Sequence, residues 1–289
     1  MFILNEWKSR GDYFEHQGRP IFFQRSQREA DLLLCLHGFP TSSFDYRRVW
    51  GALAERFDVV APDLIGYGFS AKPYEFDYTT FAQADVIEAL LQHLKAEHLH
   101  ILAHDYGNTI TQELLARDLE RRLEFSIGSI CFLNGALFPE THRPILAQKL
   151  LISPIGKYFG RLITERRFAA SLASIFGPET KPTEREIDDC LALFKHNKGK
   201  LIAHKLIRYM RERKTYRARW VEALQKMRQP FLFINGSFDP VSGKHLVDRF
   251  RELVPHQTNV AELPQIGHFP HLEAPETVTE LFLYFHDVM

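Results

Sequence analysis

The stretch that decides the fold is His98-Leu-His-Ile-Leu-Ala-His-Asp-Tyr-Gly107. It opens with an apolar run that predicts a strand, and residues 109–117 after it have the composition of a helix. Between them lies Asp105, with small residues two positions before it (Ala103) and two positions after it (Gly107). Because small neighbours relieve crowding in a strained strand-to-helix turn, the stretch predicts a sharp elbow with Asp105 at its tip.

The residue type at the tip indicates the chemistry. A Ser hydroxyl in this place needs a base to remove its proton, whereas the carboxylate of Asp105 is already ionised at neutral pH, since an ordinary carboxyl pKa is about 4. A carboxylate can attack a saturated carbon and displace a leaving group, which gives an ester on the enzyme. Water activated by a His then attacks the carbonyl of that ester. Asp105 therefore favours epoxide opening or carbon–halogen displacement over ordinary ester cleavage.

Composition narrows the class of protein. The chain has 289 residues, of which 45% are hydrophobic, enough to bury the core of one large domain or of a domain with an insertion. Its 36 basic and 36 acidic residues give a formal net charge of zero, so there is no electrostatic case for nucleic acid or an anionic membrane as partner. No stretch approaches the roughly 20 apolar residues of a membrane span.

Cysteine usage and the first residues indicate the compartment. Cys35, Cys131 and Cys190 cannot form a complete disulfide set, and we expect them to be reduced and at least half-buried. The opening run, residues 1–8, is too short an apolar stretch for a signal peptide. The sequence therefore predicts a cytoplasmic protein. It leaves both a monomer and a homodimer open.

Alternating strands and helices predict an α/β fold, a mostly parallel sheet covered by helices on both faces. Eight strands are expected at residues 12–16, 21–24, 31–36, 58–62, 98–103, 125–133, 231–235 and 259–263. Helices are expected near residues 42–56, 81–95, 243–253 and 275–288. Residues 135–227 break the alternation with helical stretches at 145–151, 161–175, 184–195, 200–213 and 217–227. We interpret 135–227 as a helical cap (lid) inserted into a core formed by residues 1–134 and 228–289.

Two later motifs supply partners for Asp105. Asp239 follows the apolar strand at 231–235, where it is placed to hold an imidazole in one tautomer. His268 follows the last strand and opens the loop into the last helix, so we predict that it is the base. The order nucleophile, acid, His supports this assignment. His271 is expected to be a helix-start residue, and His104 a structural neighbour of the elbow.

An oxyanion hole is predicted from the backbone. His37-Gly-Phe-Pro40 follows a buried strand, where Gly38 permits close approach of the backbone. The amides of Phe39 and Tyr106 could together stabilise the tetrahedral intermediate on Asp105, an effect of about 3–4 kcal/mol per donor in comparable sites. His37 is expected to hydrogen-bond beneath this loop, and Asp63 to bond local amides in its own turn.

The chain resembles the epoxide hydrolase and haloalkane dehalogenase branch of the α/β-hydrolase superfamily, and within it most closely the mesoderm-specific transcript family. The resemblance covers nearly the whole chain. It is carried by His37-Gly-Phe-Pro-Thr-Ser-Ser-Phe-Asp-Tyr46, Asp63-Leu-Ile-Gly-Tyr-Gly-Phe-Ser70, His104-Asp-Tyr-Gly-Asn108, Asn134-Gly-Ala-Leu-Phe-Pro-Glu-Thr-His-Arg-Pro144 and Lys214-Thr-Tyr-Arg-Ala-Arg-Trp220. The resemblance implies an eight-stranded sheet with an inserted cap, and it fixes mechanism better than substrate.

Departures from that branch bear on the leaving group. Haloalkane dehalogenases usually carry side-chain N–H donors for the halide where this chain has Tyr106 and Phe39, and the Arg that follows the nucleophile in fluoroacetate dehalogenases is missing. An epoxide instead needs an acid for its alkoxide, and epoxide hydrolases use cap tyrosines. Tyr209 is similar in placement to one of these, and Tyr158 and Tyr216 are further candidates.

The sequence thus predicts a hydrolase that needs no cofactor and no metal, acting through an Asp105 ester on a small apolar or aromatic substrate, with epoxides favoured. Haloalkane dehalogenation and the hydrolysis of an activated ester or lactone remain open. A third possibility is a hydrolase-like binding protein without catalysis, although such a protein has no need of a nucleophile, acid and base in order.

Overall fold

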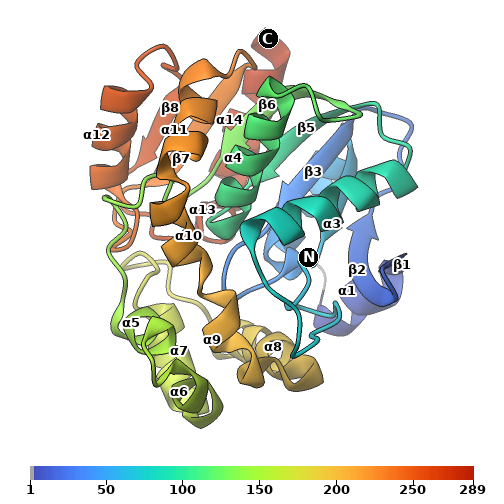
Figure 1. The fold of residues 1–289 in the computed structure, drawn as a ribbon. Coiled ribbons are helices and arrows are strands. Elements are labelled where there is room, and N and C mark those ends of the chain that lie inside the picture. The colour runs from blue at the N-terminus through green and yellow to red at the C-terminus, as the bar shows by residue number, and fades with distance from the viewer. Residues whose placement is uncertain (1–2) are drawn as a thin grey trace.

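An eight-stranded sheet forms the centre of the molecule (Figure 1), seen in a computed structural model that describes residues 3–289. The order is β1-β2-β4-β3-β5-β6-β7-β8. β1 pairs with β2, and β2 with β4, in antiparallel fashion. The other six strands, β3 to β8, run parallel to one another. The strands are β1 (Asp12–His16), β2 (Arg19–Arg25), β3 (Leu32–Leu36), β4 (Asp58–Pro62), β5 (His98–Ala103), β6 (Ser126–Phe132), β7 (Phe231–Gly236) and β8 (Val260–Leu263). All eight predicted strands are confirmed.

Both faces of the sheet are buried, which is why its strands are continuous apolar runs. In β3, Leu32, Leu34 and Leu36 enter one core cluster, and Leu33 and Cys35 enter the other. The first face is covered by α3 (Thr80–His93), α4 (Tyr106–Leu119), α11 (Arg217–Lys226) and α12 (Lys244–Leu253). The second is covered by α1 (Leu4–Arg10), the 3-10 helix η1 (Ser43–Arg48), α2 (Trp50–Ala54) and α14 (Pro275–Val288).

The helices between β6 and β7, α5 to α10, are called the insertion helices below. In Figure 1, α5 to α9 lie at the bottom, beyond one end of the sheet, and α10 lies above them. The insertion helices are α5 (Leu146–Ile152), α6 (Gly156–Leu162), α7 (Glu165–Ala173), α8 (Glu184–Lys195), the 3-10 helix η2 (His196–Leu201), α9 (Ala203–Leu206) and α10 (Tyr209–Thr215). The division of the chain into core and cap stays a prediction. The last helix of the predicted cap, α11, packs against α4 on the sheet.

Several predicted helices are divided in the structure. The helix expected over 161–175 is wrong as one element, because Thr164 is extended and caps a new helix, its hydroxyl accepting from the amide of Arg167. The helix expected over 200–213 is likewise divided into η2, α9 and α10. The segment 42–56 is a 3-10 turn capped by Ser42, followed by α2. The amino-terminal helix α1 was not predicted; it buries Trp7.

The three thiols are free and buried, with Cys35 and Cys131 on strands and Cys190 on α8, as predicted. Of the opening run discussed above, Met1 and Phe2 lie outside the described residues. Across residues 3–289, no helix has both the length and the apolar character needed to cross a bilayer. The last short helix, α13 (Pro270–Glu273), connects the loop after β8 to α14, and His271 lies in it as predicted.

Candidate active site

Asp105 lies at a strained turn between β5 and α4. Its φ of 46° and ψ of −104° lie outside the regions that a non-glycine residue ordinarily adopts. Its amide donates to the carbonyl of Asn134 at 2.7 Å. A side chain at Gly107 would place its Cβ 2.2 Å from the carbonyl oxygen of Leu36, so only glycine fits there. The predicted elbow geometry is therefore present.

The carboxylate of Asp105 is buried, with only 3% of the residue exposed. Its Oδ2 accepts from the amide of Phe39 at 3.0 Å. The close approach expected at Gly38 is to Asp105 itself, since a Cβ there would lie 2.5 Å from that of Asp105. Burial alone would raise the pKa of Asp105, but the positive charges of His268 and Arg213 hold it below its ordinary value. The carboxylate is therefore ionised at neutral pH.

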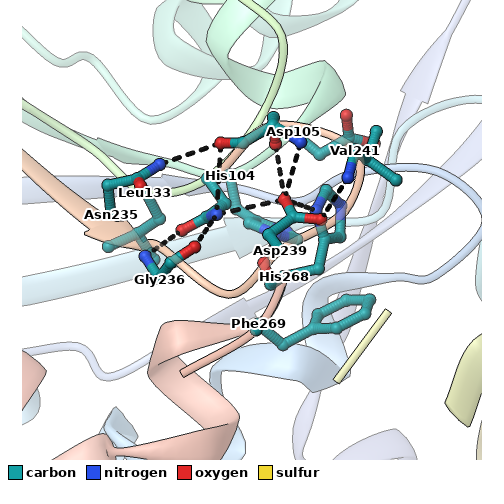
Figure 2. Close-up of polar contacts among 12 residues, drawn as sticks. His104, Asp105, Leu133, Asn235, Gly236, Asp239, Val241, His268 and Phe269 are labelled. Carbon is teal, nitrogen blue, oxygen red and sulfur yellow. Dashed lines mark hydrogen bonds and ion pairs between the residues drawn. The ribbon is translucent and has the colours of Figure 1, made fainter. Parts of the chain in front are cut away.

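Asp239 and His268 form a hydrogen-bonded pair, with Nδ1 of His268 2.7 Å from Oδ2 of Asp239 (Figure 2). The carboxylate is held from several sides: Oδ1 accepts from the amide of Val241 at 2.8 Å, and Oδ2 from the hydroxyl of Ser242 at 2.6 Å and the side-chain amide of Asn134 at 3.1 Å. Burial opposes the charge, but the imidazole outweighs it and lowers the pKa of Asp239 to about 2. An ionised carboxylate thus holds Nδ1 protonated and leaves Nε2 for chemistry.

His268 is charged in the resting site. Burial would lower its pKa, but the carboxylates of Asp239 and Asp105 raise it to about 9. One of these two charges disappears if Asp105 is converted to an ester, and the pKa of His268 then falls. The backbone of His268 is fixed as well: its amide donates to the carbonyl of Ile175, and its carbonyl accepts from Nε2 of His104, each at 2.8 Å.

Tyr209 comes from the amino-terminal end of α10 and lies fully buried beside the elbow. Its ring stacks on that of Tyr106, with centroids 4.4 Å apart. Its hydroxyl has no hydrogen-bond partner within residues 3–289. Burial, and after it the charge of Asp105, raises the pKa of Tyr209 well above its usual value, so the phenol stays protonated. A second buried phenol, Tyr67, which the sequence analysis missed, also lacks a partner among those residues and is electrostatically coupled to Asp105.

The other two candidate tyrosines lie elsewhere. Tyr158 on α6 is 64% exposed. Tyr216, between α10 and α11, is 37% exposed and packs edge-on against Phe81 with ring centroids 4.7 Å apart. The amide of Tyr106, the second predicted oxyanion-hole donor, belongs to the first turn of α4, where amides lack intrahelical acceptors.

Arg213 contacts the elbow and was not predicted from the sequence. It comes from α10, is 2% exposed along its side chain, and donates from Nη2 to the carbonyl oxygen of Asp105 at 3.2 Å. The same nitrogen lies 3.7 Å from Oδ1 of that residue, the oxygen that Phe39 does not engage. Its Nε donates to the hydroxyl of Thr109 at 2.8 Å. A buried cation therefore faces the carboxylate from the side of the insertion helices.

A cavity opens between the strand-end loops and the insertion helices. Its empty volume is about 710 Å³, part of it open to solvent. The polar residues of its lining include His268, Gln148 and Arg167, of which Arg167 is exposed to solvent. The rest is mostly apolar and includes Phe39, Val241, Leu151, Phe159, Phe168, Leu172, Ile175 and Phe194. Such a cavity suits an apolar compound of small to moderate size, with His268 at one wall.

A buried polar group lies behind the catalytic loop. Asp45, His104 and His271 offer ligand atoms within 4.8 Å of one another, a donor set that could hold a metal ion. Burial raises the pKa of Asp45 to about 7 and lowers that of His104 to about 3, so neither is fully charged near neutrality. Both ring nitrogens of His271 lack partners within residues 3–289. Because His104 also donates to the carbonyl of His268, we assign the group a supporting place behind the loop.

Two predicted structural residues are in their expected places. His37 accepts from the amide of Leu64 at 3.0 Å through Nε2, and its Nδ1 lies 2.9 Å from the carbonyl oxygen of Gly38. Asp63 accepts from the amides of Ser43 and Phe69 at 2.8 and 2.7 Å. These contacts fix the loop that carries the Phe39 amide.

Comparisons with known proteins identify the family of the chain. The model of the alpha/beta hydrolase fold family matches residues 31–275. The mesoderm-specific transcript protein of Mus musculus is 39% identical over 295 residues, which cover 98% of this chain and 87% of that protein. The soluble epoxide hydrolase of Corynebacterium sp. is 44% identical over 149 residues, 46% of this chain and 51% of that protein.

Among solved structures, the haloalkane dehalogenase DbeA of Bradyrhizobium elkani has a similar fold. Its TM-score is 0.78 at 22% identity, and the match covers 96% of this chain and 99% of that chain. The likeness at this identity concerns the fold alone. The family match and the identity with the mesoderm-specific transcript protein together establish the family. The chain belongs to the α/β-hydrolase family, in the group that contains the mesoderm-specific transcript proteins.

Proposed function

We propose that the protein is an epoxide hydrolase that uses Asp105 as nucleophile and His268, oriented by Asp239, as base. The observation that carries the proposal is the state of the Asp105 carboxylate. It is ionised and buried on a strained elbow, with Oδ2 held by the Phe39 amide, and we assign the attack to Oδ1, which lies 3.7 Å from Nη2 of Arg213. The relative named soluble epoxide hydrolase, which matches about half of the chain, supports the choice of epoxides.

In the first step, Oδ1 of Asp105 forms a bond to a carbon of the epoxide while that carbon's bond to the ring oxygen breaks. The electron pair goes to the ring oxygen, which takes the phenolic proton of Tyr209. A proton donor is needed because an alkoxide is too basic to leave unprotonated. Loss of the Asp105 charge lowers the pKa of His268, whose proton then restores the phenol.

In the second step, neutral His268 takes a proton from water, and the oxygen of that water bonds to the carbonyl carbon of the ester. The Phe39 and Tyr106 amides stabilise the resulting oxyanion. Collapse breaks the bond between the carbonyl carbon and the alkyl oxygen, which takes the remaining proton of the attacking water. The product is a diol, and the site returns to ionised Asp105 and charged His268.

The His268→Gln variant is the direct test. It should still form the ester but not hydrolyse it, since Gln cannot take the proton of water. Intact-mass spectrometry after incubation with pooled epoxides should show a gain equal to one whole epoxide, and peptide mapping should place it on Asp105. In wild-type enzyme, a single turnover in ¹⁸O-water should put the label into Asp105 rather than into the diol.

Two controls sharpen this experiment. His256→Gln, at an exposed position, should keep full turnover, and Asp105→Ala combined with His268→Gln should show no adduct. In a separate incubation with pooled haloalkanes, a mass gain equal to one haloalkane minus its hydrogen halide would replace the epoxide claim with dehalogenation. Sustained turnover by His268→Gln would overturn the assignment of the base. Tight binding of many compounds with no adduct would favour a binding protein.

The Tyr209→Phe variant should slow ester formation from epoxides by about 10²-fold, the lower end of what a positioned acid contributes. Ester formation from a bromoalkane should be nearly unchanged, because bromide needs no proton. The rates are measured by quenched intact-mass analysis in the His268→Gln background. Tyr216→Phe is the matched control and should behave as its parent, and equal slowing with both substrates would argue that Tyr209 only shapes the site.

A further inference from the structure

We propose that Glu273 is a positioning residue that fixes the loop of His268 and couples it to the insertion helices, so that hydrolysis of the Asp105 ester depends on Glu273 and formation of the ester does not. This inference rests on the proposed function, because it assigns Glu273 to the second of the two proposed steps. Glu273 is the last residue of α13, which lies between the loop of His268 and α14.

The first argument is that Glu273 holds the backbone on both sides of His268. Its Oε1 accepts from the amide of Phe269 at 2.9 Å, and its Oε2 accepts from the amide of Gly267 at 2.9 Å. The amide of His268 itself donates to the carbonyl of Ile175 at 2.8 Å. Three successive amides therefore have fixed acceptors, and the backbone that carries the imidazole cannot turn without breaking one of these hydrogen bonds.

The second argument is that the same carboxylate holds part of the insertion. Its Oε2 also accepts from the amide of Gly177 at 2.8 Å and from the hydroxyl of Thr180 at 2.5 Å, both in the segment 174–183 between α7 and α8. This segment packs closely on the loop of the imidazole. A Cβ at Gly267 would lie 2.4 Å from the amide nitrogen of Gly177, and one at Gly177 would lie 2.3 Å from the carbonyl oxygen of Gln265. The two segments are therefore joined at one carboxylate.

The third argument concerns which step uses these contacts. Ester formation needs the carboxylate of Asp105 and the phenol of Tyr209, which lie at the start of α4 and on α10. Hydrolysis needs Nε2 of His268 directed at a water molecule. Because misplacing a catalytic group by about 1 Å can slow a step about 10²-fold, a displaced His268 loop should affect hydrolysis alone.

Charge acts in the same direction. Burial lowers the pKa of His268, and the charges of Asp239, Asp105 and Glu273 together raise it to about 9. In the ester, the charge of Asp105 is gone. Glu273 then helps Asp239 to stabilise the imidazolium that forms as His268 takes the proton of water.

The Glu273→Gln variant tests the division between the two steps. An amide has one acceptor oxygen, so in either orientation its NH2 group faces a backbone amide and a hydrogen bond is lost. With His268 intact, hydrolysis should slow by about 10- to 100-fold, and the ester should accumulate during turnover of an epoxide, as followed by quenched intact-mass analysis. In the His268→Gln background, adding Glu273→Gln should leave the rate of ester formation within about twofold of its parent.

Further variants serve as controls. Glu273→Asp keeps the carboxylate and should recover part of the hydrolysis rate, and Glu276→Gln, an exposed acid in the first turn of α14, should behave as wild type. Thr180→Val removes one hydroxyl donor and no backbone contact, so it should remain folded and slow hydrolysis less than Glu273→Gln does. Equal slowing of both steps would show that Glu273 only supports the fold and would overturn the inference, as would unchanged hydrolysis.

Hydrogen exchange measures the coupling without any substrate. In peptide-level mass spectrometry, Glu273→Gln should speed amide exchange in residues 174–180 and 264–270 together, while the elbow at residues 103–109 keeps its wild-type rates. Unchanged exchange in either of the first two segments would overturn the coupling. Absence of any ester in the His268→Gln parent would instead overturn the proposed function, and with it the assignment of Glu273 to a step, while the exchange rates would still decide the coupling.

Discussion

The Asp105→Ala variant should lose turnover by at least about 10⁴-fold, the scale on which removal of a covalent nucleophile acts in enzymes whose catalytic groups work as a unit. No neighbouring carboxylate can replace it, because the described residues that line the cavity include neither Asp nor Glu. Steady-state diol formation measures the loss. Retained activity above about 1% of wild type would contradict the nucleophile assignment.

The companion variant Asp105→Asn tests the electrostatics at the same position. His268 has a pKa of about 9 because the charges of Asp239 and Asp105 outweigh burial. Removing one of those charges should lower this pKa, as followed by NMR titration of the imidazole ring. In wild type, the raised pKa stabilises the fold fully below the ordinary His pKa, and the contribution is lost as pH rises through about 9. Asp105→Asn should shift that loss to lower pH.

The fold was predictable because the central strands are buried on both faces, so that each is a continuous run of apolar residues in the sequence. The predicted bounds of β4 and β5 agree with the structure to the residue. Helix bounds were harder to predict, since apolar periodicity continues through a break that depends on one capping residue. The break lies at Ile163 and Thr164, between the end of α6 and the start of α7, and neither of these two residues is a Gly or Pro that would indicate it.

The candidate site was predictable where a strand end fixes the place of a residue. Asp105, Asp239 and His268 follow β5, β7 and β8, and parallel strands bring those ends together. Arg213 was not predictable by this reasoning. It lies in Arg211-Glu-Arg-Lys214, a composition typical of an exposed helix face, and it reaches an elbow 108 residues earlier in the chain. Its inward direction depends on how α10 is oriented, which periodicity does not give.

That orientation depends on a buried ion network next to the site. Glu113 on α4 is fully buried, and its two carboxylate oxygens accept from Arg117 at 2.9 Å, from Arg219 at 2.8 and 3.1 Å, and from the indole of Trp220 at 2.9 Å. Arg219 and Trp220 belong to α11, which follows directly after α10. Glu113 thus connects α4, which begins at the elbow, to α11. The helix before α11 is α10, which carries Tyr209 and Arg213.

The Glu113→Ala variant should therefore lower the free energy of unfolding by about 3–5 kcal/mol, the cost of leaving buried cationic partners without their counter-ion. Urea unfolding followed by circular dichroism measures the change. Glu120→Ala is the matched control: this carboxylate also pairs with Arg219, but its side chain is 40% exposed, so its loss should cost less than about 1 kcal/mol. Similar losses for the two variants would show that burial of the Glu113 pair adds no stability.

The Glu113→Gln variant keeps one acceptor oxygen, so its loss of unfolding free energy should fall between those of the two alanine variants. Its rate of ester formation at Asp105 should fall by more than the loss of stability explains, because α10 is no longer held in place through α11.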